Sequence, residues 1–139
     1  MNLFKKHNVK YLIVGGYAVM RYTEPRFTKD LDLLISVEIK NATAVFNALK
    51  EFGAPLSGLT VADFRKEGYF YQMGRSPMRV DILMSIPGVI FNDAWSRHER
   101  LTIDGIEMNF ISKEDLISSK RASGRPQDLI DIENLEKAL

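Results

Sequence analysis

Three aspartates lie inside segments whose other residues are mostly apolar. Asp30 and Asp32 occur in the run KDLDLLI, and Asp81 occurs in RVDILM. Alternate side chains of a β-strand face the same side, so Asp30 and Asp32 share one face, about 6.6 Å apart. Two uncompensated anions in an apolar strand are unfavourable and need a counter-charge. Three carboxylates from two neighbouring strands would suit two divalent cations, Mg²⁺ or Mn²⁺, which position the phosphates of a nucleotide.

The same carboxylates also have a structural interpretation. Asp30 and Asp32 could belong to a solvated strand edge or to salt bridges, and Asp81 could pair with Arg79 or another surface base. Taken alone, these segments leave both interpretations open.

Two adjacent glycines, Gly15 and Gly16, separate the apolar run YLIV from the start of a helix. Such a turn lets a phosphate approach the backbone at the positive end of the helix. The segment lacks both the third glycine of the dinucleotide fingerprint and the Gly-Lys-Ser/Thr ending of a P-loop. A plain strand-to-helix turn therefore explains the two glycines equally well.

Residue counts exclude several other kinds of chemistry. The chain has no cysteine, which excludes disulfides, a thiolate nucleophile, iron–sulfur clusters and cysteine-ligated zinc. His7 and His98 are its only histidines, and their separation disfavours a His-rich metal site. Catalysis is therefore expected to depend on carboxylates, lysine and arginine.

Overall composition predicts one globular domain spanning residues 1–139. The chain is 45% hydrophobic and 27% charged, and its net charge of +1 lacks the basic excess of a dedicated nucleic-acid binder. No apolar run approaches the roughly 18 residues of a membrane span, and the first residues do not resemble a secretory signal. The cytoplasm is the expected location, with no membrane partner.

Apolar periodicity predicts the elements that position the polar groups. The predicted strands are residues 11–14, 31–36, 69–73, 78–86, 101–103 and 106–111. The predicted helices are residues 3–8, 17–22, 38–52, 59–66, 91–98, 113–123 and 127–139. The alternation of these elements predicts an α/β (α+β) fold, with a mixed sheet of about five strands flanked by helices.

Together these residues resemble the nucleotidyltransferase superfamily, which shares the DNA polymerase beta palm-like fold. Its signature is a hydrophobic strand, Gly-Gly or Gly-Ser, a spacer, Asp-hydrophobic-Asp, and a third acid on a later strand. Here Gly15 and Gly16 precede a spacer of residues 17–29, then Asp30 and Asp32, with Asp81 as the third acid. The segment GGYAV is also similar to small proteins related to AbiEii-type toxins.

The resemblance implies transfer of a nucleoside monophosphate from a nucleoside triphosphate to a hydroxyl, with release of pyrophosphate. Asp30 and Asp32 are expected to bind two metal ions. Asp81 is expected to complete the second metal site and to take the proton from the attacking hydroxyl. Gly15 and Gly16 are expected to admit the triphosphate.

The segment KRASGRPQDL near the C-terminus extends the resemblance. By similarity, Lys120 reaches the nucleotide phosphates and Asp128 supports the site. Arg26 and Lys29 are expected to help neutralise charge at the leaving phosphates. In a purely structural interpretation, Lys120 complements the negative end of one helix dipole and Asp128 the positive end of the next.

The acceptor is left open by the sequence. Basic residues at 21–29 and 120–125 predict two edges that could follow the phosphates of a transfer RNA end, which would fit a toxin-like role. The same charges could instead neutralise the carboxylates and the triphosphate of the site. These basic edges favour a transfer RNA end over a small cationic drug as the acceptor. Two alternatives are a small-molecule transferase of the aminoglycoside-modifying type and a non-catalytic nucleotide-binding antitoxin or regulatory module, although the presence of all three acids argues against the latter. A partner chain or homo-oligomer is also expected.

Overall fold

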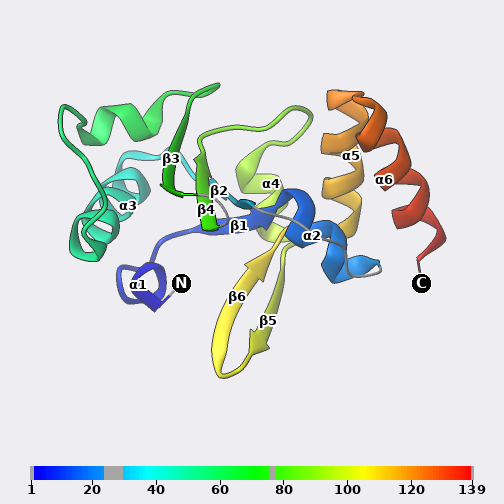
Figure 1. Ribbon diagram of the computed structural model, residues 1–139, viewed down its shortest axis with the longest axis horizontal. Helices are drawn as coiled ribbons and strands as arrows, with labels where there is room; N and C mark the ends of the chain where they lie inside the picture. Colours follow the sequence, from blue (N-terminus) through cyan, green and yellow to red (C-terminus); the bar gives the residue numbers. More distant parts are fainter. Residues whose placement is uncertain (1, 24–29, 76–77, 139) are drawn as a thin grey trace.

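The apolar run YLIV forms the centre of a mixed β-sheet. A computed structural model describes residues 2–23, 30–75 and 78–138 of the chain (Figure 1). Strand β1 (Tyr11–Val14) is buried along its whole length and lies between β2 (Asp30–Ile35) and β6 (Ile106–Phe110). The other described strands are β3 (Phe70–Arg75), β4 (Met78–Leu83) and β5 (Glu99–Ile103).

The strand order within the described residues is β3-β4-β2-β1-β6-β5. Pairs β1–β2, β3–β4 and β5–β6 are antiparallel, whereas β1–β6 and β2–β4 are parallel. This arrangement confirms the predicted mixed sheet flanked by helices. The sheet has six strands in the described part of the chain, one more than the expected number of about five.

Helices cover both faces of the sheet. They are α1 (Asn2–Lys6), α2 (Gly15–Tyr22), α3 (Ile39–Phe52), α4 (Phe91–Ser96), α5 (Lys113–Ser123) and α6 (Pro126–Lys137). Figure 1 shows the α5–α6 pair at the opposite end of the molecule from α3. None of the described helices is long and apolar enough to cross a lipid bilayer.

Most predicted elements differ from the observed ones by one or two residues at their ends, and two differ further, one in type and one in length. The helix predicted at residues 59–66 is a 3₁₀ helix, η1 (Val61–Arg65), whose first turn is closed by a capping box between Thr60 and Asp63. The strand predicted at residues 78–86 ends at Leu83. Beyond it, Ile86 and Pro87 line a cavity together with residues of α5.

Alternation along the strands divides the core into two apolar layers. Ile13 and Leu33 belong to the layer that packs against α1, α3 and η1. Leu12 and Leu34 belong to the layer that packs against α2, α4, α5 and α6. Complete burial of one leucine side chain, such as that of Leu12, contributes about 1.5–3 kcal/mol to folding. The two layers fix the strands from both sides.

The turn between α5 and α6 sets how these two helices meet. Helix α5 ends at Gly124, which has φ +66° and donates its N–H to Lys120 O. Pro126 begins α6, where its missing N–H leaves no helical hydrogen bond unmade. The chain therefore reverses within two residues, and the last turn of α5 lies against the first turns of α6.

Candidate active site

Two rows of polar side chains cross neighbouring strands of the sheet. In the first row, Asp32 of β2 lies opposite Asp81 of β4, which lies opposite Gln72 of β3. In the second row, Asp30 of β2 lies opposite Arg79 of β4. Residues two apart on a strand share a face, so both rows lie on the same side of the sheet. This is the side of the sheet on which α2 and α5 pack.

Asp32 is half-buried and lies close to two other carboxylates, those of Asp81 and Asp30. Burial, the nearby charges of Asp81 and Asp30, and a hydrogen bond with Asp81 raise the pKa of Asp32 to about 6, against an opposing effect of Lys120. Ionisation of Asp32 at neutral pH is therefore opposed by burial and by like charge. A hard divalent cation would relieve this repulsion, and carboxylate oxygens are the ligands that Mg²⁺ and Mn²⁺ prefer. The Asp32–Asp81 pair therefore fits such an ion.

Asp30 makes a different contact from its two neighbours. Arg79 Nη2 donates to Asp30 Oδ2 at 3.1 Å, while Gln72 Nε2 donates to Asp81 Oδ1 at 2.9 Å. Among the residues that the structure describes, no three histidine, aspartate or glutamate side chains are gathered to hold a metal ion. The structure thus brings Asp32 and Asp81 together, whereas the carboxylate of Asp30 is engaged by Arg79.

Gly15 makes a close approach to Asp32 that requires a glycine. Its φ is +69°, and a Cβ atom at this position would lie 2.4 Å from Asp32 Oδ2. Gly16, in contrast, does not have a positive φ. Helix α2 begins at Gly15, and its N-cap residue, Val14, makes no side-chain capping hydrogen bond. The first N–H groups of α2 therefore have no side-chain acceptor from the cap residue.

A cavity of about 120 Å³ joins the glycine turn to the two C-terminal helices. Its lining comprises Val14, Gly15, Asp32, Leu83, Ile86, Pro87, Leu116, Ser119, Lys120, Ser123, Arg125 and Asp128. Gly15, Asp32, Lys120 and Asp128, which come from distant parts of the sequence, thus surround one space. Predicted site residues Arg26 and Lys29 lie outside the described residues.

Lys120 is held in a buried network of ion pairs. Its Nζ lies 3.3 Å from Asp128 Oδ1 and 3.0 Å from Asp131 Oδ2, and both carboxylates are 1% exposed. Arg125 Nε donates to Asp128 Oδ2 at 2.8 Å, and Gln127 Nε2 donates to Asp131 Oδ1 at 2.9 Å. Lys120 therefore binds α6 and lines the cavity. A lysine that only complemented the dipole of α5 would need neither these ion pairs nor this burial.

The charges around Asp128 have opposing effects on its ionisation. Burial alone would raise the pKa of Asp128, but hydrogen bonds from Arg125 and the charge of Lys120 hold it below the usual range. Asp128 is therefore ionised at neutral pH, and it orients the side chains of Lys120 and Arg125 at the cavity wall.

Three polar residues of this region were not among the predicted site residues, and Arg79, considered as an ion-pair partner of Asp81, pairs with Asp30 instead. Arg79 lies two residues before Asp81 on its strand, and Asp131 lies three residues after Asp128 on its helix. A spacing of two on a strand places Arg79 on the same face as Asp81, and a spacing of three on a helix places Asp131 on the same face as Asp128. These spacings could have indicated both residues from the sequence. Gln72 carried no such signal, because its place beside Asp81 depends on the register between β3 and β4.

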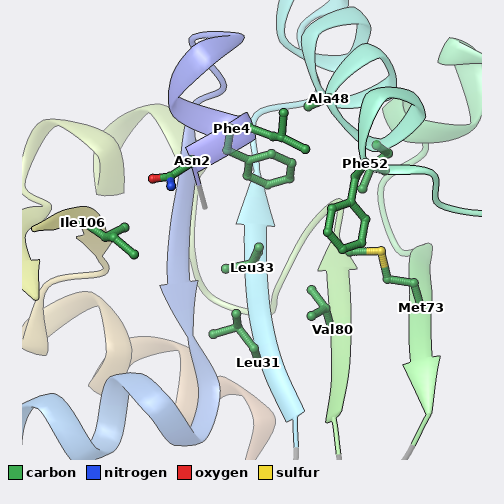
Figure 2. A pocket seen from close by; sticks show the side chains of 11 residues that line it. Asn2, Phe4, Leu31, Leu33, Ala48, Phe52, Met73, Val80 and Ile106 are labelled. Carbon is green, nitrogen blue, oxygen red and sulfur yellow. The ribbon is translucent and has the colours of Figure 1, made fainter. Parts of the chain in front are cut away.

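A larger pocket lies on the opposite face of the sheet. This apolar space of about 390 Å³ lies between α1, α3 and the strands (Figure 2). Leu31 and Leu33 line it and alternate along β2 with Asp30 and Asp32. Volume alone would favour this pocket as the active site, but Asp30, Asp32 and Asp81 lie on the other face of the sheet.

Comparison with known proteins assigns a family to this arrangement. Residues 1–137 match the model of a family described as nucleotidyltransferase of unknown function (DUF6036). The chain belongs to this nucleotidyltransferase family. It is therefore a transferase enzyme of the general class that moves nucleoside monophosphates. The resemblance to the nucleotidyltransferase superfamily inferred from the sequence is confirmed.

Two solved structures share the fold of this nucleotidyltransferase. The crystal structure of a lincosamide antibiotic adenylyltransferase, LnuA, bound to lincomycin has a TM-score of 0.60 and 18% identity, with 98% of this chain and 91% of that chain covered. An antigenic nucleotidyltransferase-like protein from Paracoccidioides brasiliensis has a TM-score of 0.56 and 17% identity, with 95% of this chain and 69% of that chain covered. No curated protein matches the chain in sequence.

Asp32 is expected to destabilise the metal-free nucleotidyltransferase increasingly as the pH rises. The pKa of Asp32 is about 6 in the folded protein, against an ordinary value of 3.8, so between these pH values the Asp32 carboxyl binds more protons in the folded state than in the unfolded state. The contribution of Asp32 to the unfolding free energy should therefore decrease from pH 4 to pH 7, by up to about 3 kcal/mol. Urea titrations in a metal chelator can measure this decrease.

An Asp32→Asn variant provides the control, because it lacks the titrating group. The difference in unfolding free energy between variant and wild type should grow in favour of the variant as the pH rises. Parallel pH profiles for the two proteins would contradict the electrostatic description of Asp32.

Proposed function

We propose that this enzyme transfers a nucleoside monophosphate from a nucleoside triphosphate to a hydroxyl group, with Mg²⁺ or Mn²⁺ as cofactor. One observation carries the proposal: Gly15, Asp32 and Lys120 line the same cavity. A backbone turn open to phosphate, an acid able to hold a cation and a lysine able to neutralise phosphate are the groups that this reaction needs.

Each polar side chain has a role in the proposed reaction. Asp32 and Asp81 hold the divalent cations, and Asp30 joins them from the same face. When bound, these cations neutralise phosphate charge and make the acceptor hydroxyl a better nucleophile. Asp81 takes the proton of that hydroxyl. Gln72 keeps one oxygen of the Asp81 carboxylate in place.

Lys120 binds the outer phosphates in this proposal. An ammonium group has three N–H donors, and two of them are directed to Asp128 and Asp131. The third is available to a phosphate oxygen in the cavity. The N–H groups of the first turn of α2, including that of Gly16, contribute further positive potential.

Replacement of Lys120 by methionine is expected to affect triphosphate more than monophosphate binding. Triphosphate affinity should fall about tenfold or more through loss of a charged hydrogen bond, and monophosphate affinity should change much less. The unfolding free energy should also fall by about 3–5 kcal/mol, because two buried carboxylates lose their lysine. Calorimetric titrations and chemical unfolding measure these changes.

Arg121→Gln is the matched control for Lys120. Arg121 is the next residue of α5, but its side chain is 63% exposed and contacts the exposed Glu136. Neither affinity should change appreciably in this variant. Equal losses of triphosphate and monophosphate affinity in the Lys120 variant would show that the lysine only supports the fold.

We further propose a small hydroxyl-bearing molecule as the first candidate acceptor. Within the described residues, three of the arginines predicted to form basic edges are paired with acids: Arg21 with Glu99, Arg121 with Glu136, and Arg125 with Asp128. Such pairing reduces the repulsion that a cationic acceptor would meet. The structurally similar LnuA supports this choice. It is an adenylyltransferase of a small molecule, a lincosamide antibiotic, and 91% of its chain is covered by this one.

An RNA end, with the toxin-like role that the sequence suggested, is the second candidate. The observation that favours it is the exposure of two arginines, since the side chain of Arg125, which lines the cavity, is 73% exposed and that of Arg121, the residue after Lys120, is 63% exposed. Exposed guanidinium groups are suited to RNA phosphates. A partner chain or homo-oligomer that completes the acceptor site stays a proposal as well.

A salt series distinguishes the two acceptors. Binding of transfer RNA should weaken steeply with added salt if exposed arginines contact its phosphates, because counterions are released on binding. With a small acceptor, RNA binding should be weak and flat, while labelled nucleotide should appear in a small-molecule fraction. Transfer of no label to either fraction would contradict both acceptors.

A further inference from the structure

Asp30, Asp32 and Asp81 form an acidic face of the sheet, and Arg79 places a positive charge within it. Arg79 Nη2 lies 3.1 Å from Asp30 Oδ2, and the two residues are directly opposite on the parallel strands β4 and β2. Asp81, two residues after Arg79, faces Asp32 in the same way. Arg79 therefore partly compensates the charge of the three carboxylates and engages the carboxylate of Asp30.

Two features indicate that Arg79 is able to leave this position. The ion pair is accessible to water, because the side chains of Arg79 and Asp30 are 39% and 34% exposed, and such pairs are weak. In addition, Arg79 Nε is buried and, within the described residues, has no hydrogen-bond partner. A guanidinium group with an unsatisfied buried N–H is incompletely bound, and a nearby anion would improve its hydrogen bonding.

We propose that Arg79 competes with the divalent cation for Asp30 and releases this carboxylate when a triphosphate binds. This inference rests on the proposed function, since it requires that the acidic face hold a cation. In the free protein Arg79 lowers the affinity of the face for metal ions. With a triphosphate present, the guanidinium has new oxygen acceptors, so Asp30 becomes free to join Asp32 and Asp81.

Arg79 therefore couples the binding of the metal ion to the binding of the nucleotide. Each ligand should strengthen the other, because both favour the arrangement in which Arg79 has left Asp30. The metal ion alone has to displace Arg79 without compensation. This coupling would keep the acidic face from binding metal ions firmly before a triphosphate arrives.

Manganese binding in the absence of nucleotide tests this competition without any measurement of activity. Free Mn²⁺ is counted by electron paramagnetic resonance during titration of the full chain. Arg79→Gln should bind Mn²⁺ about tenfold more tightly than wild type, because a positive charge near the ion is removed and Asp30 is freed. Arg79→Lys keeps the charge and should remain closer to wild type.

The same titrations in the presence of a non-hydrolysable triphosphate analogue measure the coupling. The analogue should tighten Mn²⁺ binding by a larger factor in wild type than in Arg79→Gln. Arg100→Gln serves as the control for loss of one positive charge, since Arg100 lies on β5 near Glu107. Its Mn²⁺ affinity should match that of wild type, and melting temperatures confirm that all variants are folded.

The outcomes separate this inference from the proposed function. Equal or weaker Mn²⁺ binding by Arg79→Gln would overturn the competition, provided that Asp32→Asn loses the Mn²⁺ binding seen in wild type. Equal Mn²⁺ binding by wild type and Asp32→Asn would instead contradict the proposed metal site, and the role of Arg79 would fall with it.

Discussion

Replacement of Asp32 by asparagine is expected to lower the rate of nucleotide transfer by about 1,000-fold or more. Asparagine has nearly the same shape but carries no charge, so the site loses its ability to stabilise charge on the reacting phosphate. Folding should not suffer, because Asp32 is the group whose pKa is raised by burial and by like charges. Rates from labelled triphosphate and unfolding by urea measure the two effects.

Asp104→Asn is the matched control for this substitution. Asp104 lies in the exposed turn between β5 and β6 with φ +52°, a conformation that asparagine tolerates. Its rate and stability should equal those of wild type. If Asp32→Asn retained more than about a tenth of the activity, Asp32 would not be a catalytic metal ligand.

Replacement of Gly15 by alanine is expected to lower the rate by about 100-fold or more. The added Cβ would lie 2.4 Å from Asp32 Oδ2, so the carboxylate has to move from its place opposite Asp81. Displacement of a catalytic group by about 1 Å has an effect of this size. The positive φ of +69° also makes alanine unfavourable in the folded state, by about 1 kcal/mol or more.

Gly58→Ala separates the collision from the backbone strain. Gly58 has φ +78°, and a Cβ atom there would meet nothing within 4 Å. Alanine at this position should lower the unfolding free energy by a similar amount, through backbone strain alone, while the rate stays at the wild-type value. Equal rates for Gly15→Ala and wild type would show that the close approach to Asp32 has no part in catalysis.

Local sequence patterns were sufficient to place Asp30 and Asp32 on one face and Asp81 on a neighbouring strand. Period-two alternation in an apolar run is a property of the segment itself. The pairing of Arg79 with Asp30 could not be predicted in this way. It depends on the parallel register between β2 and β4, two strands that are separated by α3, η1 and β3 in the sequence.

The same distinction applies to the C-terminal helices. The segment around Lys120 and Asp128 was recognisable by similarity, and Gly124 predicted where α5 ends. The participation of Asp131 depends on the angle at which α6 packs against α5, which the turn sets in three dimensions. The apolar pocket beneath Leu31 and Leu33 likewise depends on the spacing of α1 and α3 over the sheet.

Transfer of the nucleoside monophosphate is the central claim, and the position of the label in the triphosphate tests it most directly. The enzyme is incubated with Mg²⁺ or Mn²⁺, an acceptor pool of cellular RNA or small molecules, and triphosphate labelled at the α- or the γ-phosphorus. Label from the α-position should appear in an acceptor, and label from the γ-position should appear in pyrophosphate. Transfer of the γ-label to the acceptor, or loss of neither label from the triphosphate, would contradict the proposed reaction.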